Sequence, residues 1–189
     1  MGGSGLRVDP LDVRPALSDE RRSRRSASAL RGFSLLRQGV FPNGRIKATS
    51  NQAGLVVATE AKIVFDTTVK DSPADDTEGD PDGSMADLTN NRIYARHAGW
   101  YIVMASIPWE VESGGDYRRA RVKKNGATVE GTDTSDPIAI FNTFNNLVVP
   151  LQLDKDDYIE LFATHGVGAG LDVIATGEAP YLALTWVGL

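Results

Sequence analysis

Residues 147–161 read LVVPLQLDKDDYIEL, and this stretch decides the fold. In its first half every second residue is apolar and lies on one face of a strand: Leu147, Val149, Leu151 and Leu153. Asp154 to Asp157 then form a polar turn, and a second strand follows over Tyr158 to Thr164. The stretch therefore predicts two neighbouring strands of a β-sheet joined by a tight turn.

Further strand candidates lie on both sides of this stretch, separated by turn signals. They are Gly54 to Lys70, Arg92 to Ala95, Gly99 to Val111, Tyr117 to Lys124, Ile138 to Phe144 and Pro180 to Leu189. Asn125-Gly126 is a strong hairpin signal, and Pro108 predicts a bulge or a sheet edge within the long strand. Many short strands with turn signals about every dozen residues are typical of an all-β sandwich or barrel.

The N-terminal part has a different character. Residues 1–50 hold ten Lys/Arg and four Asp/Glu, a net charge of +6, whereas residues 51–189 hold ten and 21, a net charge of −11. This asymmetry indicates a basic arm (1–50) and an acidic head (51–189) with different partners. Ser18 is a predicted helix N-cap, so the arm is expected to be partly helical before a turn at Phe41–Arg45.

Four segments of the head resemble, in order, the tumour-necrosis-factor / complement-globular-head jelly roll. They are Ala98-Gly99-Trp100-Tyr101, Val122-Lys123-Lys124-Asn125-Gly126, residues 149–161 and the terminal strand Tyr181 to Leu189. Ala98 replaces the usual proline of the first motif, and Asp156 replaces the usual glycine of the third. The resemblance covers about residues 55–189 and implies a ten-stranded jelly roll assembled as a homotrimer, behind an extended, partly helical arm.

Small domains of this type that lack a collagen stalk or a signal peptide often resemble bacteriophage virion proteins. The segment Leu6 to Leu11 is similar to the start of minor tail proteins of phages that infect high-GC Gram-positive hosts. We therefore expect a virion structural protein of the tail tip or tail fibre, made in the host cytoplasm without a signal peptide. A basic cluster in the arm is the predicted docking site for other virion proteins: Arg21, Arg22, Arg24 and Arg25.

Two alternatives remain open at this stage. A capsid decoration or head-fibre protein would have the same fold and differ in where the arm binds. A host-surface adhesin would bind glycans through the loops of the trimer. No segment is long and apolar enough to span a membrane, and no groove-reading motif accompanies the arginines, so neither a membrane nor a specific nucleic acid is an expected partner.

No enzymatic chemistry is predicted, so we expect no catalytic, cofactor-binding or metal-binding residues. The chain has no cysteine and two histidines, His97 and His165, and it carries neither a Gly-x-Ser-x-Gly elbow nor a His-Glu-x-x-His motif. The acidic loop Asp75–Asp82 has oxygen ligands at alternate positions that suit calcium, but its spacing does not fit an EF-hand. We therefore expect a solvated loop there.

Two further features bear on the surface of the head. Arg119, Arg121 and Lys123 fall on one face of their strand, and the sequence leaves open whether this stripe faces solvent or the threefold axis. Trp100, Trp109 and Trp186 lie within strands, where aromatic side chains are usually core. One of these three tryptophans can instead cap a surface groove.

Overall fold

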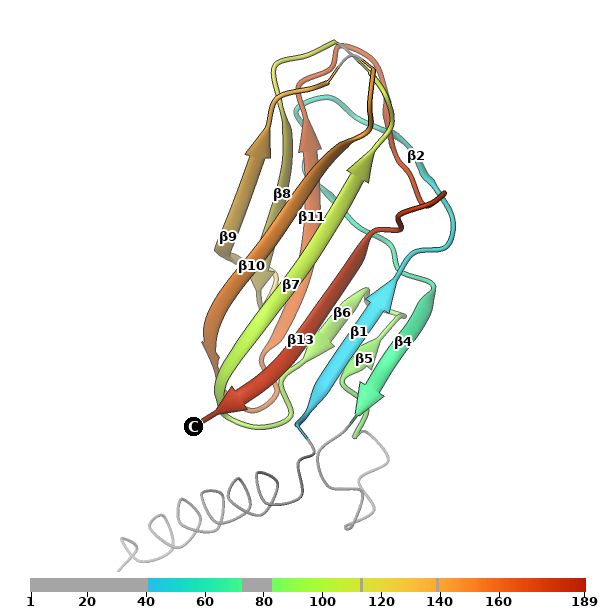
Figure 1. Ribbon diagram of the computed structural model, residues 1–189. Coiled ribbons are helices and arrows are strands. Elements are labelled where there is room, and N and C mark those ends of the chain that lie inside the picture. Colours follow the sequence, from blue (N-terminus) through green and yellow to red (C-terminus); the bar gives the residue numbers. More distant parts are fainter. Residues whose placement is uncertain (1–40, 73–82, 113, 139) are drawn as a thin grey trace, which may run out of the picture.

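A computed structural model describes residues 41–72, 83–112, 114–138 and 140–189 of the chain. They form two antiparallel sheets that pack face to face, so the predicted all-β sandwich is confirmed (Figure 1). The described residues form thirteen strands rather than the ten expected, because several strands of two to four residues accompany the long ones. The predicted arm helix lies outside the described residues.

The first sheet, sheet A, has seven strands. In spatial order its main body runs β10, β7, β13, β1, β4, while β12 and β2 extend it beside the end of β7. Their bounds are β1 (Asn43–Lys47), β2 (Gln52–Leu55), β4 (Thr67–Ser72), β7 (Gly99–Trp109), β10 (Thr143–Leu153), β12 (Leu171–Val173) and β13 (Tyr181–Gly188). The strand β10 pairs with β7 alone and therefore forms one edge of the sheet, while β4 forms the other.

The second sheet, sheet B, runs β5, β6, β11, β8, β9, and β3 adds to β11. Their bounds are β3 (Ala61–Lys62), β5 (Ala86–Asp87), β6 (Arg92–Tyr94), β8 (Arg118–Lys124), β9 (Thr128–Ser135) and β11 (Tyr158–His165). The edge strands β9 and β10 lie on the same side of the sandwich, where the side chains of Val149 and Leu147 fill the space beside Gly131. The opposite side is formed by β1 and β4.

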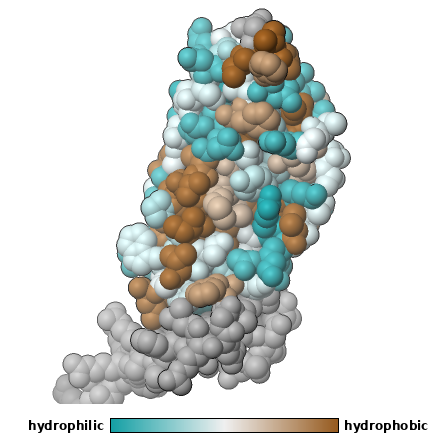
Figure 2. Space-filling model, viewed as in Figure 1, coloured by the Kyte–Doolittle hydropathy of each residue, from teal (hydrophilic) through white to brown (hydrophobic). Residues whose placement is uncertain are grey.

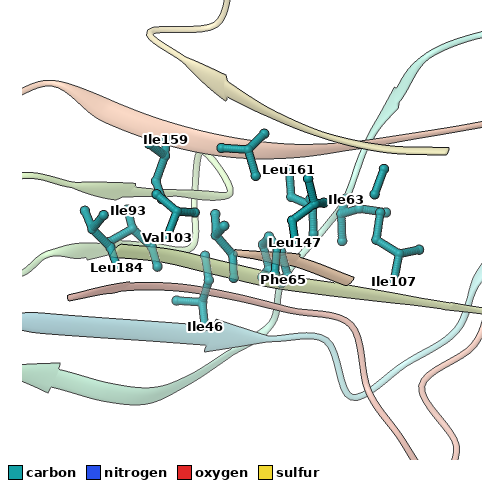
Figure 3. Close-up of a cluster of buried hydrophobic side chains, with 14 of the residues drawn as sticks. Ile46, Ile63, Phe65, Ile93, Val103, Ile107, Leu147, Ile159, Leu161 and Leu184 are labelled. Carbon is teal, nitrogen blue, oxygen red and sulfur yellow. The ribbon is translucent and has the colours of Figure 1, made fainter. Parts of the chain in front are cut away.

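The core lies between the sheets and is built from alternate residues of their strands (Figure 3). Tyr101, Val103 and Ile107 of β7 are fully buried, as are Ile159 and Leu161 of β11. The alternation predicted for residues 147–153 is confirmed, since Leu147, Leu151 and Leu153 are buried and Val149 is partly buried. Burial of these side chains supplies the main driving force for folding, at about 1.5–3 kcal/mol for each fully buried large residue.

Several turns and glycines have the geometry that the motifs imply. Asn125 and Gly126 have φ values of 52° and 74°, as the predicted hairpin turn between β8 and β9 requires. Gly99 has φ +148°, and a Cβ there would lie 2.3 Å from the carbonyl oxygen of Gly188. The glycine of the first motif is thus needed because the end of β13 passes directly over it.

Three expectations were wrong in detail. Residues 43–47, placed in a turn of the arm, form β1 between β13 and β4, so the head extends beyond the expected boundary at residue 50. Of the predicted strand Ile138–Phe144, residues 138 and 140–142 lie outside strands and only Thr143 and Phe144 belong to β10, while the preceding polar residues 128–135 form β9. Pro108 causes no bulge: β7 pairs with β10 there without a register shift. On the other side of β7, Pro108 lies between the last residue that pairs with β13, Ser106, and the residue that pairs with β12, Trp109.

Candidate functional site

The outer face of sheet A carries a column of apolar side chains. In β7, residues 101, 103, 105 and 107 point into the core, so the alternate residues Trp100, Ile102 and Met104 lie on the outer face. Paired residues of neighbouring strands share a face, which adds further members. The apolar column comprises six residues that these pairs place on one face, together with exposed Val187, which follows buried Trp186 in β13: Trp100, Ile102, Met104, Val148, Pro150, Ala183 and Val187.

Several members of this column are well exposed. Trp100 is 46% exposed, Val148 70% and Val187 49%. In the space-filling view, hydrophobic surface runs along β7 and β10, and hydrophilic surface covers the neighbouring part of the sheet around β1 (Figure 2). Antiparallel sheets with one solvated face normally alternate apolar and polar residues. A contiguous apolar strip on the outer face is typical of a protein–protein contact.

The apolar column is bordered by a cationic strip, which we define as Arg45, Lys47 and Lys70. Arg45 pairs in register with Ala183 on one side and with Lys70 on the other, so the strip lies on the same outer face. The guanidinium of Arg45 lies 4.4 Å from the centre of the Tyr181 ring. A hollow of about 360 Å³ lies at the border between the strip and the column, lined in part by Arg45, Lys47, Ser106, Glu178 and Tyr181.

The outer face of sheet B is different, because it carries the basic stripe of β8 among acidic and aromatic side chains. Arg121 lies 3.2 Å from Glu60, and Lys123 also pairs with Glu60. Burial raises the pKa of the Glu60 carboxyl, but the hydrogen bonds from Lys123 and Arg121 outweigh it and lower this pKa overall. Arg119, Arg121 and Lys123 therefore lie on the face opposite the apolar column, where acidic and aromatic side chains surround them.

Other charges of sheet B are also paired. Lys62 lies 2.6 Å from Glu160, and Lys124 lies 2.7 Å from Asp157. Burial raises the pKa of Asp157, yet hydrogen bonds from Lys124, Asn125 and the backbone of Asp154 lower this pKa overall. This face is built to be solvated.

A polar cluster is buried at the end of the sandwich where β7 and β11 finish. The Nε1 of Trp109 donates to the Oδ1 of Asn145 at 2.8 Å. His165 is fully buried. Its Nε2 lies 2.7 Å from the Leu55 carbonyl oxygen, and its Nδ1 accepts from the Val167 amide. Both histidine nitrogens are thus engaged with the backbone, a structural role for this residue.

A cation is buried in the same cluster. The guanidinium of Arg118 is fully buried and donates to the carbonyl oxygens of Glu112, Gly114 and Tyr117. Burial lowers the pKa of Arg118, against an opposite effect of the nearby carboxylates of Glu112 and Glu110. Its hydrogen bonds fix the loop between β7 and β8 to the end of the sandwich.

A second hollow, of about 650 Å³, lies beside β5 and β6 and is lined in part by Asp87, Tyr94, Arg96 and Asp156. Its polar groups already bind one another, since Arg96 lies 3.3 Å from Asp156 and its guanidinium lies 4.7 Å from the centre of the Tyr94 ring. The guanidinium of Arg92 lies 4.8 Å from the centre of the same ring. Tyr94 therefore serves as a platform for two arginines rather than for a sugar ring.

Loops at the end near β12 expose further apolar side chains. Ile138, Ile140 and Phe141 of the β9–β10 loop are 48%, 73% and 65% exposed, and Val111 follows the end of β7 nearby. Figure 2 shows hydrophobic surface gathered at this end, over the β9–β10 loop. The first described residue, Phe41, lies at the opposite end of the sandwich, before β1.

The other predicted sites lie where the structure gives no description. Arg21, Arg22, Arg24 and Arg25 belong to residues 1–40, and the acidic loop Asp75–Asp82 falls within residues 73–82. Within the described ranges, no three His, Cys, Asp or Glu side chains are grouped so as to hold a metal ion. No helix among those same residues has the length and hydropathy needed to cross a membrane.

Sequence reasoning missed the apolar column, although a signal for it exists. Residues 100–105 read WYIVMA, a run in which both faces of the strand are apolar. In an antiparallel sheet, such a run indicates that both faces are covered. Of the three tryptophans, Trp109 and Trp186 are buried and Trp100 lies on the outer face.

Comparison with known proteins addresses the fold. By sequence, no family model and no curated protein matches the chain. By structure, murine APRIL at pH 5.0 matches with a TM-score of 0.53 at 8% identity, over 78% of this chain and 100% of that chain. Eiger TNF from S. frugiperda matches with a TM-score of 0.53 at 12% identity, over 78% and 93% of the two chains.

A third solved structure, the globular domain of the zebrafish complement 1qA protein, matches with a TM-score of 0.48 at 10% identity, over 76% of this chain and 93% of that chain. The identities of all three are far below the level at which function transfers. The two higher-scoring structures span most of the described head. The chain has the fold of a tumour-necrosis-factor-like jelly roll.

Proposed function

We propose that this protein works by assembly and binding, as a homotrimer whose heads meet through the outer face of sheet A. The observation that carries the proposal is the apolar column, which exposes Trp100, Val148 and Val187 along the outer face of sheet A. Proteins with this fold usually form homotrimers. Closed cyclic assembly buries such a face in every copy and leaves none of it in water.

We further propose that the trimer is a structural component of a bacteriophage virion, at the tail tip or in a tail fibre. The resemblance of Leu6 to Leu11 to minor tail proteins supports this identity. So does the contrast between a basic arm and an acidic head, because a basic arm can dock on an acidic particle surface while the like-charged heads stay soluble. Arg21, Arg22, Arg24 and Arg25 are the residues assigned to that docking.

Incorporation into particles tests this identity. The double variant Arg21→Glu/Arg22→Glu is expected to abolish incorporation while the isolated trimer is unchanged, since the arm carries docking and the head carries assembly. Arg119→Glu, on the outer face of sheet B, is the matched control and is expected to be incorporated normally. Normal incorporation of the double variant would refute docking through the arginine cluster.

Two alternative functions are compatible with the same trimeric head. A capsid decoration or head-fibre protein would dock its arm on the capsid, and imaging of labelled particles separates this location from the tail. A host-surface adhesin is favoured by the apolar loops at the end away from Phe41, where Ile140 and Phe141 are exposed. Binding of the purified head to host envelope or to its glycans, lost in Ile140→Ser/Phe141→Ser, would support the adhesin.

A further inference from the structure

The two long edges of the sandwich differ in their charged side chains. The edge formed by β9 and β10 has acidic side chains and no basic ones, because residues 125–154 contain Glu130, Asp133, Asp136 and Asp154 but no Lys or Arg. The opposite edge carries the cationic strip on β1 and β4, with Asp71 as the acidic residue of β4. The apolar column lies between these two edges on sheet A. The apolar face of sheet A thus has the cationic strip on one side and, beyond β10 on its other side, the acidic edge strand β9 of sheet B.

Glu130 and the strip also lie at the same level along the strands. Arg45 pairs with Ala183, Ala183 with Met104, and Met104 with Val148, so these four residues form one row across sheet A. At the far edge, the space beside Gly131 is filled by Leu147 and Val149, which flank Val148. Glu130 precedes Gly131 and therefore lies close to Val148, at the end of the row opposite Arg45.

A β-bulge is centred on this glutamate. Val122 pairs with Gly131 and Lys123 pairs with Val129, so Glu130 is an extra residue of β9 that faces no residue of β8. Bulges on edge strands often re-aim a side chain and end local pairing. Among the described residues, Glu130 has no ion pair, in contrast to Glu60 and Glu160 of the same sheet.

The side chains of the cationic strip likewise lack ion-pair partners among the described residues. Arg45 and Lys70 stand directly opposite each other, and like charges in that position are destabilising. Neither they nor Lys47 has an ion pair with a described residue. An acidic group supplied from outside the chain would relieve this repulsion, and the hollow lined by Arg45, Lys47, Tyr181 and Glu178 gives it room; Glu178 itself makes no ion pair with the strip.

We propose that in the trimer the cationic strip of one copy pairs with Glu130 of the next copy. This inference rests on the proposed homotrimer. The apolar column runs along the strands, so a ring that covers it has its axis in roughly that direction, and rotation about this axis keeps every residue at its level. The positive edge of one head then meets the negative edge of its neighbour with Arg45 and Glu130 in register. The pairing fixes how neighbouring heads are aligned.

A charge swap in the full-length protein tests the contact. Sedimentation of a dilution series at low salt gives the concentration at which half of the protein is trimeric, with urea added in equal amount to all samples. Arg45→Glu/Lys47→Glu is expected to raise that concentration roughly tenfold or more, and Glu130→Lys to raise it several-fold. The triple variant that carries both sets of changes is expected to recover most of the loss.

The matched control reverses two cations that are not on sheet A. Arg119→Glu/Lys155→Glu is expected to leave the midpoint within about twofold of the unaltered protein. Circular dichroism of each variant confirms that its head is folded; should the strip variant fail to fold, Glu130→Lys and its rescue by Arg45→Glu decide the question alone. Raised salt is also expected to weaken the unaltered trimer and to have less effect on Arg45→Gln/Lys47→Gln.

The possible failures are distinguishable. The charge contact would be refuted if Arg45→Glu/Lys47→Glu and Glu130→Lys trimerise as well as the unaltered protein. It would also be refuted if the triple variant trimerises as weakly as the two sets of changes predict when their effects are added. Neither result would argue against the trimer itself. An unaltered chain that is monomeric at every concentration would overturn the proposed function itself.

Discussion

The outer faces of the two sheets differ sharply, although both sheets supply the same core. On sheet B, basic side chains have acidic partners: Arg121 and Lys123 contact Glu60, and Lys62 contacts Glu160. On sheet A, the corresponding positions of β7 and β10 hold Trp100, Met104 and Val148. On sheet B the charged side chains have partners within the chain, whereas on sheet A exposed apolar side chains form a surface that the proposed trimer would bury.

This contrast separates two kinds of stability. The charged face of sheet B contributes little to folding, because partly exposed ion pairs are each worth about 0.2–1 kcal/mol. The exposed part of the apolar face of sheet A adds little to the stability of the isolated chain but would gain about 25 cal/mol for each Å² that a partner removes from water. Changes on sheet A should therefore act on assembly, and changes on sheet B on the folded chain alone.

The largest effect is expected from a charge placed in the apolar column. In Val148→Glu, each contact between heads would bury a carboxylate without a partner, at a cost of about 3–5 kcal/mol. Val148 is 70% exposed in the single chain, so the fold itself should be retained. Sedimentation at micromolar concentration is expected to show monomers with unchanged circular dichroism.

The matched control for this change is Arg119→Glu, on β8 and the outer face of sheet B, away from the edge strand β9. It is expected to stay trimeric. Loss of the trimer in both variants, or in the control alone, would show that the two faces do not differ in the way described.

A smaller effect, on the folded chain, is expected at the glycine that lets β13 close over β7. In Gly99→Ala, the new Cβ would lie 2.3 Å from the Gly188 carbonyl oxygen, and the residue would keep φ +148°. Strain and displacement together should lower the free energy of unfolding by about 2–3 kcal/mol in urea titrations. Gly168→Ala, with no atom within 4 Å of its Cβ, is the control and should change it by less than about 0.5 kcal/mol.

A smaller effect is expected from low pH, which should reduce the free energy of unfolding. The pKa values of Glu60, Asp87 and Asp157 are lowered in the folded chain. Carboxylates with lowered pKa values add stability that is complete above their ordinary pKa and is lost as pH falls through the folded pKa. The contribution of these three carboxylates to the free energy of unfolding should therefore be constant from pH 7 to about 5 and fall by about 1–2 kcal/mol on the way to pH 3. A free energy of unfolding that increases as pH falls from 5 to 3 would contradict these ion pairs.

The smallest effect is expected from one ion pair of sheet B. Glu60→Gln leaves Arg121 and Lys123 without their acidic partner and should cost about 0.5–1 kcal/mol at pH 7, measured by urea unfolding. The variant should also lose less stability than the unaltered protein between pH 5 and pH 3. Its trimer should be intact, and a change of oligomeric state would argue against the division of roles between the faces.

Local sequence patterns were enough to predict the sandwich and its central strands. The apolar alternation of residues 147–153 and the turn at Asn125-Gly126 are determined within a few residues. The strands that were missed depend on distant partners. β1 reads NGRIK, which favours a turn, and it becomes a strand because it pairs with Tyr181 to Thr185 and with β4.

The same reasoning explains why β9 and the candidate site escaped. β9 reads TVEGTDTS, and its polar residues are tolerated because it is an edge strand. The apolar column combines residues from β7, β10 and β13, which are up to 87 positions apart between Trp100 and Val187. No local pattern brings these residues together. The arginine cluster of the arm remains a prediction, since residues 1–40 lie outside the described part.

The native mass of the protein tests the central claim most directly. It should be measured by sedimentation on the full chain and on residues 41–189, since removal of residues 1–50 would delete β1. If three heads assemble through the apolar column, both samples should have the mass of three chains. A single-chain mass in both would contradict assembly through sheet A, and a trimer only of the full chain would assign assembly to the arm.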